Sequence, residues 1–384
     1  MHIKKLAIIT THPIQYNAPM FRLLSERGRV KLKVFYTLGE KYYDHFDSGF
    51  GKVIKWDIPL LEGYDYVFLK NSSIVPNANH FFSIINPCLN KEVKSWNADA
   101  LLVFGWHFYS HLSAIMHFKN KIPIFFRGDS HLLGRKNKLS NFLRSQLTWI
   151  YKNIDIALYV GQNNKNYFLN YGLKEKQLFF VPHAIDNKRF QLNIEENKIQ
   201  SLAWRRLLGI ADDEIVFLYV GKLISAKGIL FLIETFKQLK LTNAHLILAG
   251  SGVCERKCKE NINSRIHFIG FQNQKNMPVV YNLGDVLVVP SINQESWALV
   301  VNEAMVCGLP VLVSNKCGCA IDLVHQGVNG YIFASGDTNG LRLKMEAMSD
   351  NERLKIMGKA SLEIINNWSL ELSCSRIEEI ISSY

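Results

Sequence analysis

The chain contains 384 residues, of which 48% are hydrophobic and 20% are charged, as in an ordinary globular protein. Its length suits two domains that each bury a core of their own. No run of about 20 apolar residues occurs, so the sequence predicts no transmembrane helix. The apolar run 6–9 behind Lys4 and Lys5 is too short for a signal peptide. Seven cysteines without a regular framework predict reduced thiols in a cytosolic protein rather than disulfides or a metal site.

The net charge of +12 is unevenly distributed along the chain. Residues 1–190 hold 26 Lys and Arg against 13 Asp and Glu, whereas residues 191–384 hold 19 against 20. Two interpretations stay open: a solubilising surface, or a face for an anionic membrane or a phosphate-linked acceptor. Nucleic acid is not indicated, because no element carries a basic motif with interleaved aromatic residues.

In the first half, buried-type strands alternate with helical stretches. Strands are predicted at residues 6–10, 31–36, 100–104, 123–126 and 156–160. Pro19 fits the first turn of a helix that ends near Gly28. Because these strands are continuously apolar rather than alternating, they favour a parallel sheet.

The alternation of strands and helices begins again in the second half of the chain. Strands are predicted at residues 215–220, 245–249, 266–268, 286–289 and 310–313, with a helix at 229–240 and a polar linker at 191–200. The tail 351–384 is predicted to be helical, with Trp368 as an apolar anchor. The predicted fold class is α/β, with two doubly wound, Rossmann-like domains, 1–190 and 191–364, and a C-terminal helix of about 365–384 returning to the first. Ligands of such sheets bind beyond the carboxyl ends of the strands.

Three loops of the first domain carry polar residues at these positions. Thr11, His12 and Tyr16 follow the first strand and precede a helix N-terminus that suits an anion, although a simple turn capped by Asn17 is an open alternative. His107 follows the strand 100–104 and is favoured as functional, with His111 ranked below it on the same helix face.

Arg127 and Asp129 follow the strand 123–126. Arg127 suits either a phosphate or an ion pair with Asp129, and the sequence does not decide between them.

The second domain opens with a glycine turn and two lysines. Gly221 lets the backbone approach a ligand closely, and Lys222 and Lys227 are able to converge on a diphosphate as point charges. The Walker spacing of a P-loop is absent. Gly250 forms a second glycine turn after the next strand, at 245–249.

The most informative segment contains Glu295 and Glu303, eight positions apart. The pattern predicts a helix over residues 296–307, ended by Gly308. Its first amides, at about 297–299, favour negative charge, and Glu303 points back toward that end. A carboxylate among apolar residues is costly unless it is paired, and Glu303 is suited to accept hydrogen bonds from a vicinal diol such as that of ribose. A capping residue with a structural ion pair is the alternative.

These residues resemble the retaining glycosyltransferases of family 4, which have the GT-B fold and an E-x7-E motif. Glu295 and Glu303 have that spacing, residues 181–186 resemble the element before the interdomain linker, and Lys222 and Lys227 resemble the diphosphate-binding basic pair. The resemblance is specific over roughly residues 180–335. It implies the GT-B arrangement, in which two parallel sheets face each other across a cleft.

The resemblance also implies roles for individual residues. His107, Glu295, Lys222 and Lys227 are the catalytic candidates. The donor-binding candidates are Glu303, Gly221, Ser296, Trp297, Ala298, Leu299, Gly250, Thr11 and His12. The loop at Thr11 lacks the glycines of the family, which removes backbone cradling of phosphate there. Tyr16, Arg127 and Asp129 are the acceptor-side candidates, and neither a metal nor another cofactor is expected.

The function implied is transfer of a sugar, with retention, from a UDP- or GDP-sugar to a glycan or lipid-linked acceptor in cell-surface polysaccharide biosynthesis. A nucleotide-sugar 2-epimerase of the same fold and a non-catalytic protein that binds membrane or nucleic acid are the alternatives. The expected location is the cytoplasm, peripheral to the inner face of the membrane.

Overall fold

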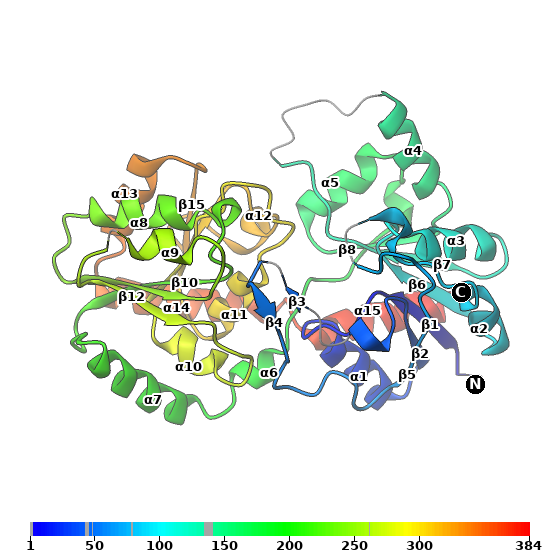
Figure 1. Cartoon of the computed structure of the whole chain (residues 1–384), viewed down its shortest axis with the longest axis horizontal. Helices are drawn as coiled ribbons and strands as arrows, with labels where there is room; N and C mark the ends of the chain where they lie inside the picture. Colours follow the sequence, from blue (N-terminus) through cyan, green and yellow to red (C-terminus); the bar gives the residue numbers. More distant parts are fainter. Residues whose placement is uncertain (1–2, 43–45, 48, 78–79, 134–140, 261) are drawn as a thin grey trace. The chain divides into compact units, whose positions relative to one another are not determined.

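The computed structural model describes residues 3–42, 46–47, 49–77, 80–133, 141–260 and 262–384 (Figure 1). The chain divides into two compact units. Unit 1 comprises Met1–His45, Pro59–His183 and Leu370–Tyr384, and unit 2 comprises Phe46–Ile58 and Ala184–Ser369. The predicted spans placed all of residues 1–190 in one domain, whereas the segment Phe46–Ile58, called the arm below, belongs to unit 2.

Unit 1 is built on a parallel sheet that has seven strands in the described residues, ordered β5-β2-β1-β6-β7-β8-β9. The order runs outward in both directions from β1 and β6, so the sheet is doubly wound with its switch point between them. The strands are β1 (Lys5–Thr10), β2 (Lys31–Tyr36), β5 (Asp65–Phe68), β6 (Ala100–Phe104), β7 (Ile124–Arg127), β8 (Ile156–Tyr159) and β9 (Leu178–Phe180).

The helices of unit 1 follow its strands along the chain. The predicted first helix is confirmed, with Pro19 in its first turn and Gly28 at its end in a left-handed conformation (φ 64°) that a Cβ would strain. Asn17 makes no side-chain cap. The helices are α1 (Ala18–Arg27), α2 (Leu89–Ser95), α3 (Tyr109–Phe118), α4 (Asn141–Tyr151), α5 (Gln162–Asn170) and α15 (Leu370–Ser382), with the short turns η1 (Glu40–Tyr42), η2 (Phe81–Ser83) and η3 (Glu175–Gln177).

The last helix of the chain packs in unit 1, where α15 lies beside α1 (Figure 1). Arg27 on α1 donates two hydrogen bonds, of 2.7 and 2.8 Å, to the carboxylate of Glu378 on α15. The Glu378 side chain is only 5% exposed and that of Arg27 is 23% exposed. A carboxylate this deeply buried depends on its cations, of which Arg27 is the nearer and Arg29, at 3.4 Å and 68% exposed, the more distant.

Replacing Arg27 with Ala is therefore expected to lower the free energy of unfolding by about 3 kcal/mol, the lower end for breaking a buried ion pair. Urea unfolding followed by circular dichroism measures the change. Glu175→Ala is the control, because Glu175, which pairs with Lys165, is 67% exposed and pairs with an exposed carboxylate contribute about 0–1 kcal/mol. Equal losses in the two variants would contradict the prediction.

Unit 2 is built on a second parallel sheet, six-stranded within the described part of the chain and ordered β12-β11-β10-β13-β14-β15. This order has its switch point between β10 and β13. The two doubly wound parallel sheets predicted from the sequence are thereby confirmed. The strands are β10 (Ile215–Val220), β11 (Ala244–Ala249), β12 (Ile266–Gly270), β13 (Val286–Val289), β14 (Val311–Ser314) and β15 (Gly330–Phe333).

The helices of unit 2 correct one prediction. The expected linker at 191–200 is largely helical, because α7 begins at Ile194 and places Glu195 and Glu196 in its first turn, where negative charge is favourable. Trp368 is buried as predicted, and its ring packs at a tilt of 36° against that of Trp297. The helices are α6 (Asn187–Phe190), α7 (Ile194–Leu207), α8 (Ile229–Lys237), α9 (Glu255–Lys259), α10 (Met277–Asn282), α11 (Leu299–Val306), α12 (Ala320–Leu323), α13 (Thr338–Ala347) and α14 (Asn351–Ile365), with the turn η4 (Ser225–Lys227).

The arm contains β3 (Phe46–Asp47) and β4 (Lys52–Val53), which pair with each other in an antiparallel ribbon. Its backbone is hydrogen-bonded to the rest of unit 2: the Asn273 side chain donates to the Lys55 carbonyl at 2.7 Å, and the Ser251 hydroxyl donates to the Phe50 carbonyl at 3.2 Å. No helix in the described residues is long and apolar enough to cross a membrane.

Candidate functional site in unit 2

The predicted donor residues of unit 2 lie at the switch point of its sheet. Gly221 and Lys222 directly follow β10, and Ser291 and Glu295 lie in the loop that follows β13. Because β10 and β13 are neighbours in the sheet, these loops lie at the switch point, where doubly wound sheets bind their ligands.

Gly250, after β11, brings the backbones of two strand ends together. A Cβ at this position would overlap the carbonyl oxygen of Gly221, and its φ of 153° is one that other residues rarely adopt. The Gly221 amide in turn donates to the Ala249 carbonyl at 3.0 Å. The two predicted glycine turns thus form one tightly packed wall.

Lys227 and Glu295 form an ion pair in which the Lys227 ammonium contacts both carboxylate oxygens. Ser291, which is buried, donates a third hydrogen bond to Glu295 at 3.0 Å. Gly228 makes this approach feasible, because its φ is 73° and a Cβ would overlap the Pro290 carbonyl. The sequence predicted separate roles for Lys227 and Glu295, whereas the structure joins them in one charged unit, 30% and 17% exposed.

The helix between the two glutamates begins later than predicted, at Leu299 instead of residue 296. Ala298 adopts a left-handed φ of 81°, which interrupts the helix before Leu299. Ser296 is exposed, while the buried Trp297 ring donates to Asn302 at 2.9 Å. The Trp297 side chain therefore has a packing role, and only its backbone and that of Ala298 and Leu299 are suited to contact a donor.

Glu303 is buried on α11, with 2% of its surface exposed. The Tyr281 hydroxyl, on α10, donates to its Oε2 at 2.6 Å. This bond fixes the orientation of the carboxylate. A carboxylate has about four acceptor positions, so the bond from Tyr281 is compatible with further bonds from a diol.

The arm contributes a residue that the sequence did not indicate. The ammonium of Lys222 donates to Asp47 at 2.9 Å and lies 5.1 Å from the centre of the Phe50 ring. Burial raises the pKa of the Asp47 carboxyl, but the hydrogen bond and charge of Lys222, together with hydrogen bonds from the backbone amides of Phe50 and Gly49, outweigh burial and hold the pKa below its ordinary value. The charge of Lys222 is therefore compensated by a carboxylate 175 positions away in the sequence.

Candidate residues of unit 1

The predicted residues of unit 1 also lie at a switch point. Thr11 and His12 follow β1, and their side chains are hydrogen-bonded to each other at 2.9 Å. His107 follows β6 and is exposed. Tyr16 is half-buried in the loop before α1.

His111 is buried and serves the fold. Its Nδ1 faces the carbonyls of Gly105, at 2.9 Å, and Phe104, at 3.2 Å, and its Nε2 lies 2.9 Å from the Thr37 hydroxyl. Burial lowers the pKa of His111 to about 4, so the ring is neutral at pH 7. The lower rank given to His111 from the sequence agrees with this structural role.

Arg127 is buried, and its guanidinium donates to the carbonyls of Val181 and Pro182, both at 3.0 Å. Burial lowers its pKa to about 10, against the opposing effect of Asp129. The sequence suggested two partners for Arg127, a phosphate or the carboxylate of Asp129. Neither of them describes the contacts with these two backbone carbonyls. Asp129 instead lies 4.0 Å from His183, with 42% of its side chain exposed.

Tyr281, Ser291 and Asp47 complete the site in unit 2 but were not identified from the sequence. Tyr281 stands in an apolar run and Ser291 in a polar loop, so neither has a local signal. Asp47 belongs to a segment of the first half of the chain, and only tertiary folding places it on unit 2.

Two doubly wound parallel sheets, with lysines and glutamates at a switch point, define a two-domain α/β protein of the GT-B class. Residues 200–363 match the family Glycosyl transferases group 1. The matched region lies within unit 2 and contains both Glu295 and Glu303.

Comparisons with individual proteins agree with this match. Lipopolysaccharide 1,2-N-acetylglucosaminetransferase of Salmonella typhimurium is 29% identical over 220 residues, which are 53% of this chain and 56% of that protein. The chain thus spans about half the length of this curated relative.

The fold likeness extends over the whole chain. Sucrose-phosphate synthase from Thermosynechococcus elongatus has a TM-score of 0.76 at 18% identity, covering 99% of this chain and 98% of that one. Anabaena HepE in complex with UDP and glucose has a TM-score of 0.72 at 17% identity, covering 99% and 100%. The GT-B fold implied by the sequence motifs is confirmed.

Proposed function

We propose that this protein is a retaining glycosyltransferase that transfers a sugar from a nucleotide-sugar donor to a glycan or lipid-linked acceptor in cell-surface polysaccharide biosynthesis. The observation that carries the proposal is the Lys227–Glu295 pair at the switch point of unit 2, with Glu303 held by Tyr281. The matched family covers both glutamates. The similarity of this chain to a lipopolysaccharide N-acetylglucosaminetransferase and to a structure solved with UDP and glucose supports the same class of reaction.

In this proposal Glu303 accepts hydrogen bonds from the ribose hydroxyls of the donor. Lys222 and Lys227 neutralise the diphosphate as its bond to the sugar breaks, while Glu295 and the amides at the start of α11 orient the sugar. Stabilising the charge that develops on the leaving group is the main task in such a reaction. Glu295 is not assigned as a covalent nucleophile.

The test is a thermal-shift screen of UDP- and GDP-linked sugars, followed by a transfer assay with the sugar that stabilises the protein most. We expect stabilisation by one donor class, because a ligand that binds only the native state raises the melting temperature. Absence of any shift would contradict the proposal. Conversion of UDP-GlcNAc to ManNAc without an acceptor would show a 2-epimerase instead.

The arm leads to a prediction about donor affinity. In Asp47→Asn, Lys222 loses its carboxylate partner and becomes more available to a diphosphate. Affinity for the nucleoside diphosphate is expected to rise by up to about fivefold, since a partly exposed ion pair is worth about 0.2–1 kcal/mol. Isothermal titration measures it.

Asp57→Asn is the matched control for this substitution. It removes the same charge from the arm, but Asp57 accepts from the backbone amide of Lys275 rather than from Lys222. A weaker affinity in Asp47→Asn than in Asp57→Asn would show that Asp47 positions Lys222 for the donor and does not compete with it.

We also propose that unit 1 associates peripherally with an anionic membrane surface at the inner face of the membrane. Unit 1 contains 23 Lys and Arg against 13 Asp and Glu, so it holds most of the net positive charge. Sedimentation with vesicles is expected to require anionic lipid and to weaken at high salt, because salt screens exposed charges. Equal binding to neutral vesicles at high salt would contradict this expectation.

A further inference from the structure

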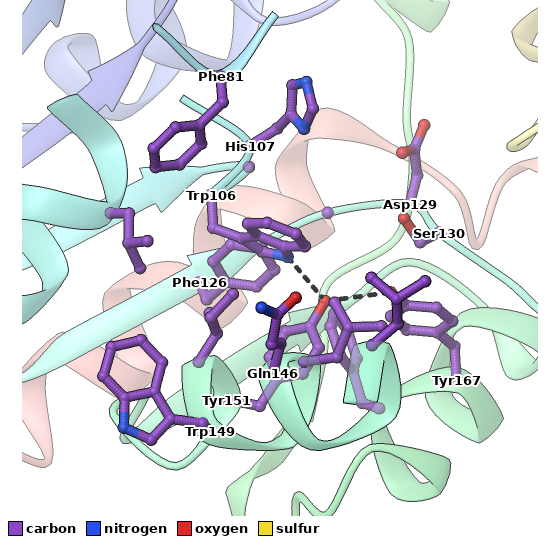
Figure 2. Close-up of a pocket in the computed structure, with 17 residues that line it drawn as sticks. Phe81, Trp106, His107, Phe126, Asp129, Ser130, Gln146, Trp149, Tyr151 and Tyr167 are labelled. Carbon is purple, nitrogen blue, oxygen red and sulfur yellow. Dashed lines mark hydrogen bonds between the residues drawn. The ribbon is translucent and has the colours of Figure 1, made fainter. Parts of the chain in front are cut away.

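A pocket of about 720 Å³ opens in unit 1 at the carboxyl ends of β6 and β7, with α4 and α5 beside it (Figure 2). This volume is within the range that holds a drug-sized molecule. His107 and Asp129, predicted to serve the reaction and its acceptor, both line it. Eleven of its 17 lining residues are aromatic or aliphatic.

The polar atoms of the deep wall bond to one another. The Trp106 ring donates to the Tyr151 hydroxyl at 3.2 Å, and that hydroxyl lies 3.5 Å from the hydroxyl of Tyr167 (Figure 2). The wall thus offers mainly ring surfaces to a ligand. A sugar buried there would lose hydrogen bonds to water without full replacement, whereas a hydrocarbon chain has none to lose.

The α4 wall is an apolar helix face turned toward the pocket. Leu143, Leu147 and Ile150 recur at the three- and four-residue spacing of one face and all line the pocket. Leu143 and Trp149 remain 45% and 51% exposed. Apolar side chains collected around an open pocket indicate a site for an apolar ligand rather than scattered surface residues.

Apart from Gln146, which lies on α4, the polar lining residues follow β6 and β7. Figure 2 shows Asp129 and Ser130 on one side and Trp149 on the other, with His107 beside Phe81 and away from Trp149. The pocket is therefore amphipathic. It matches a molecule with a polar end beside His107 and Asp129 and an apolar part along α4.

On the basis of the proposed function, we propose that this pocket binds the hydrocarbon chain of a lipid-linked acceptor and presents its polar end to His107 and Asp129. The net positive charge of unit 1 as a whole favours an anionic link such as phosphate between chain and sugar, although the described lining of the pocket itself contains Asp129 and no Lys or Arg. A hydrocarbon of either isoprenoid or acyl type satisfies this chemistry.

The experiment compares three phosphates by isothermal titration: farnesyl phosphate, dodecyl phosphate and glucose 1-phosphate. We expect at least one chain-bearing phosphate to bind about tenfold or more tightly than glucose 1-phosphate, because only the chain buries apolar surface. Tighter binding of farnesyl phosphate would identify an isoprenoid chain, and tighter binding of dodecyl phosphate an acyl chain. Equal or tighter binding of glucose 1-phosphate would overturn the proposal.

Substitutions of residues that line the pocket test whether the chain-bearing phosphate binds there. Leu143→Ala combined with Trp149→Ala is expected to weaken binding of the chain-bearing phosphate about tenfold, since both side chains line the pocket and are exposed enough to be replaced without loss of folding. Met116→Ala, an exposed apolar residue on α3 outside the pocket, should have no effect. Unchanged binding in the double variant would overturn the proposal.

Affinity for the nucleoside diphosphate separates this proposal from the proposed function. The double variant should bind UDP or GDP as the wild type does. Failure of the wild type to bind either nucleotide would refute the proposed donor but leave the chain-binding result standing. Normal nucleotide binding without chain binding would refute only the pocket assignment.

Discussion

Lys227→Ala is expected to lower kcat for sugar transfer by about 10²–10³, equivalent to about 2.7–4 kcal/mol in the barrier, as for loss of one donor to a developing anion. The variant loses the cation proposed to neutralise the leaving diphosphate. It also leaves the Glu295 carboxylate, only 17% exposed, without its main counter-charge. Both effects raise the energy of the transition state. Steady-state kinetics with a saturating donor measures the change.

Lys237→Ala is the matched control for this prediction. Lys237 lies on α8 and pairs with Glu234, whose side chain is 62% exposed. Loss of this ion pair should therefore change kcat and stability little. Circular dichroism and thermal melting verify that both variants fold.

The double variant Lys227→Ala with Glu295→Ala separates two explanations. The readout is affinity for the nucleoside diphosphate, because Glu295 is proposed to orient the sugar and not to contact the diphosphate. If Lys227 acts only by balancing Glu295, the double variant binds the nucleoside diphosphate as the wild type does. If Lys227 contacts the diphosphate, the double variant binds it as weakly as Lys227→Ala, which is the result we expect. Wild-type turnover in a folded Lys227→Ala protein would refute the assignment of Lys227.

Glu303→Gln is expected to reduce affinity for the nucleoside diphosphate about tenfold to a hundredfold. Hydrogen bonds to charged groups contribute about 1.5–3 kcal/mol, and each 1.4 kcal/mol corresponds to a factor of ten. Glutamine preserves the shape of the side chain and an oxygen for the Tyr281 hydroxyl. The change therefore removes the negative charge with little disturbance of the packing around α11.

A 2′-deoxy nucleotide makes the Glu303 prediction specific. The wild type should bind the ribonucleotide more tightly than its 2′-deoxy form, and Glu303→Gln should lose most of this preference. Glu346→Gln is the control, because Glu346 pairs with Arg342 on the same helix α13. A preserved preference in Glu303→Gln would contradict the proposed ribose contact.

The main strands of the two sheets were predicted more accurately than the short strands and the start of α11. Strands β2, β6, β10 and β13 have the predicted bounds, because continuous apolar runs between polar turns are a local signal. The short strands β5, β9 and β15 were not predicted. The start of α11 was placed three residues early, since the left-handed Ala298 has no signature in composition.

The site residues also divide into those that the sequence indicated and those that it did not. The position of His107 after a strand and the spacing of Glu295 and Glu303 were readable in the sequence. The inward orientation of Arg127 could not be predicted from the sequence. Its partners are the backbone carbonyls of Val181 and Pro182, which lie 54 and 55 positions further along the chain.

The sequence by itself determined the βαβ order of two parallel sheets, the glycine turns at their carboxyl ends and the identity of the charged residues placed there. These features depend on local periodicity and on the conformational freedom of glycine. Only the tertiary structure decided which charges meet: Lys227 with Glu295 across 68 positions, and Lys222 with Asp47 of the arm across 175. Such pairs depend on how distant segments pack. Separation along the chain carries no record of that packing, so a single sequence indicates the residues of this site but not their partners.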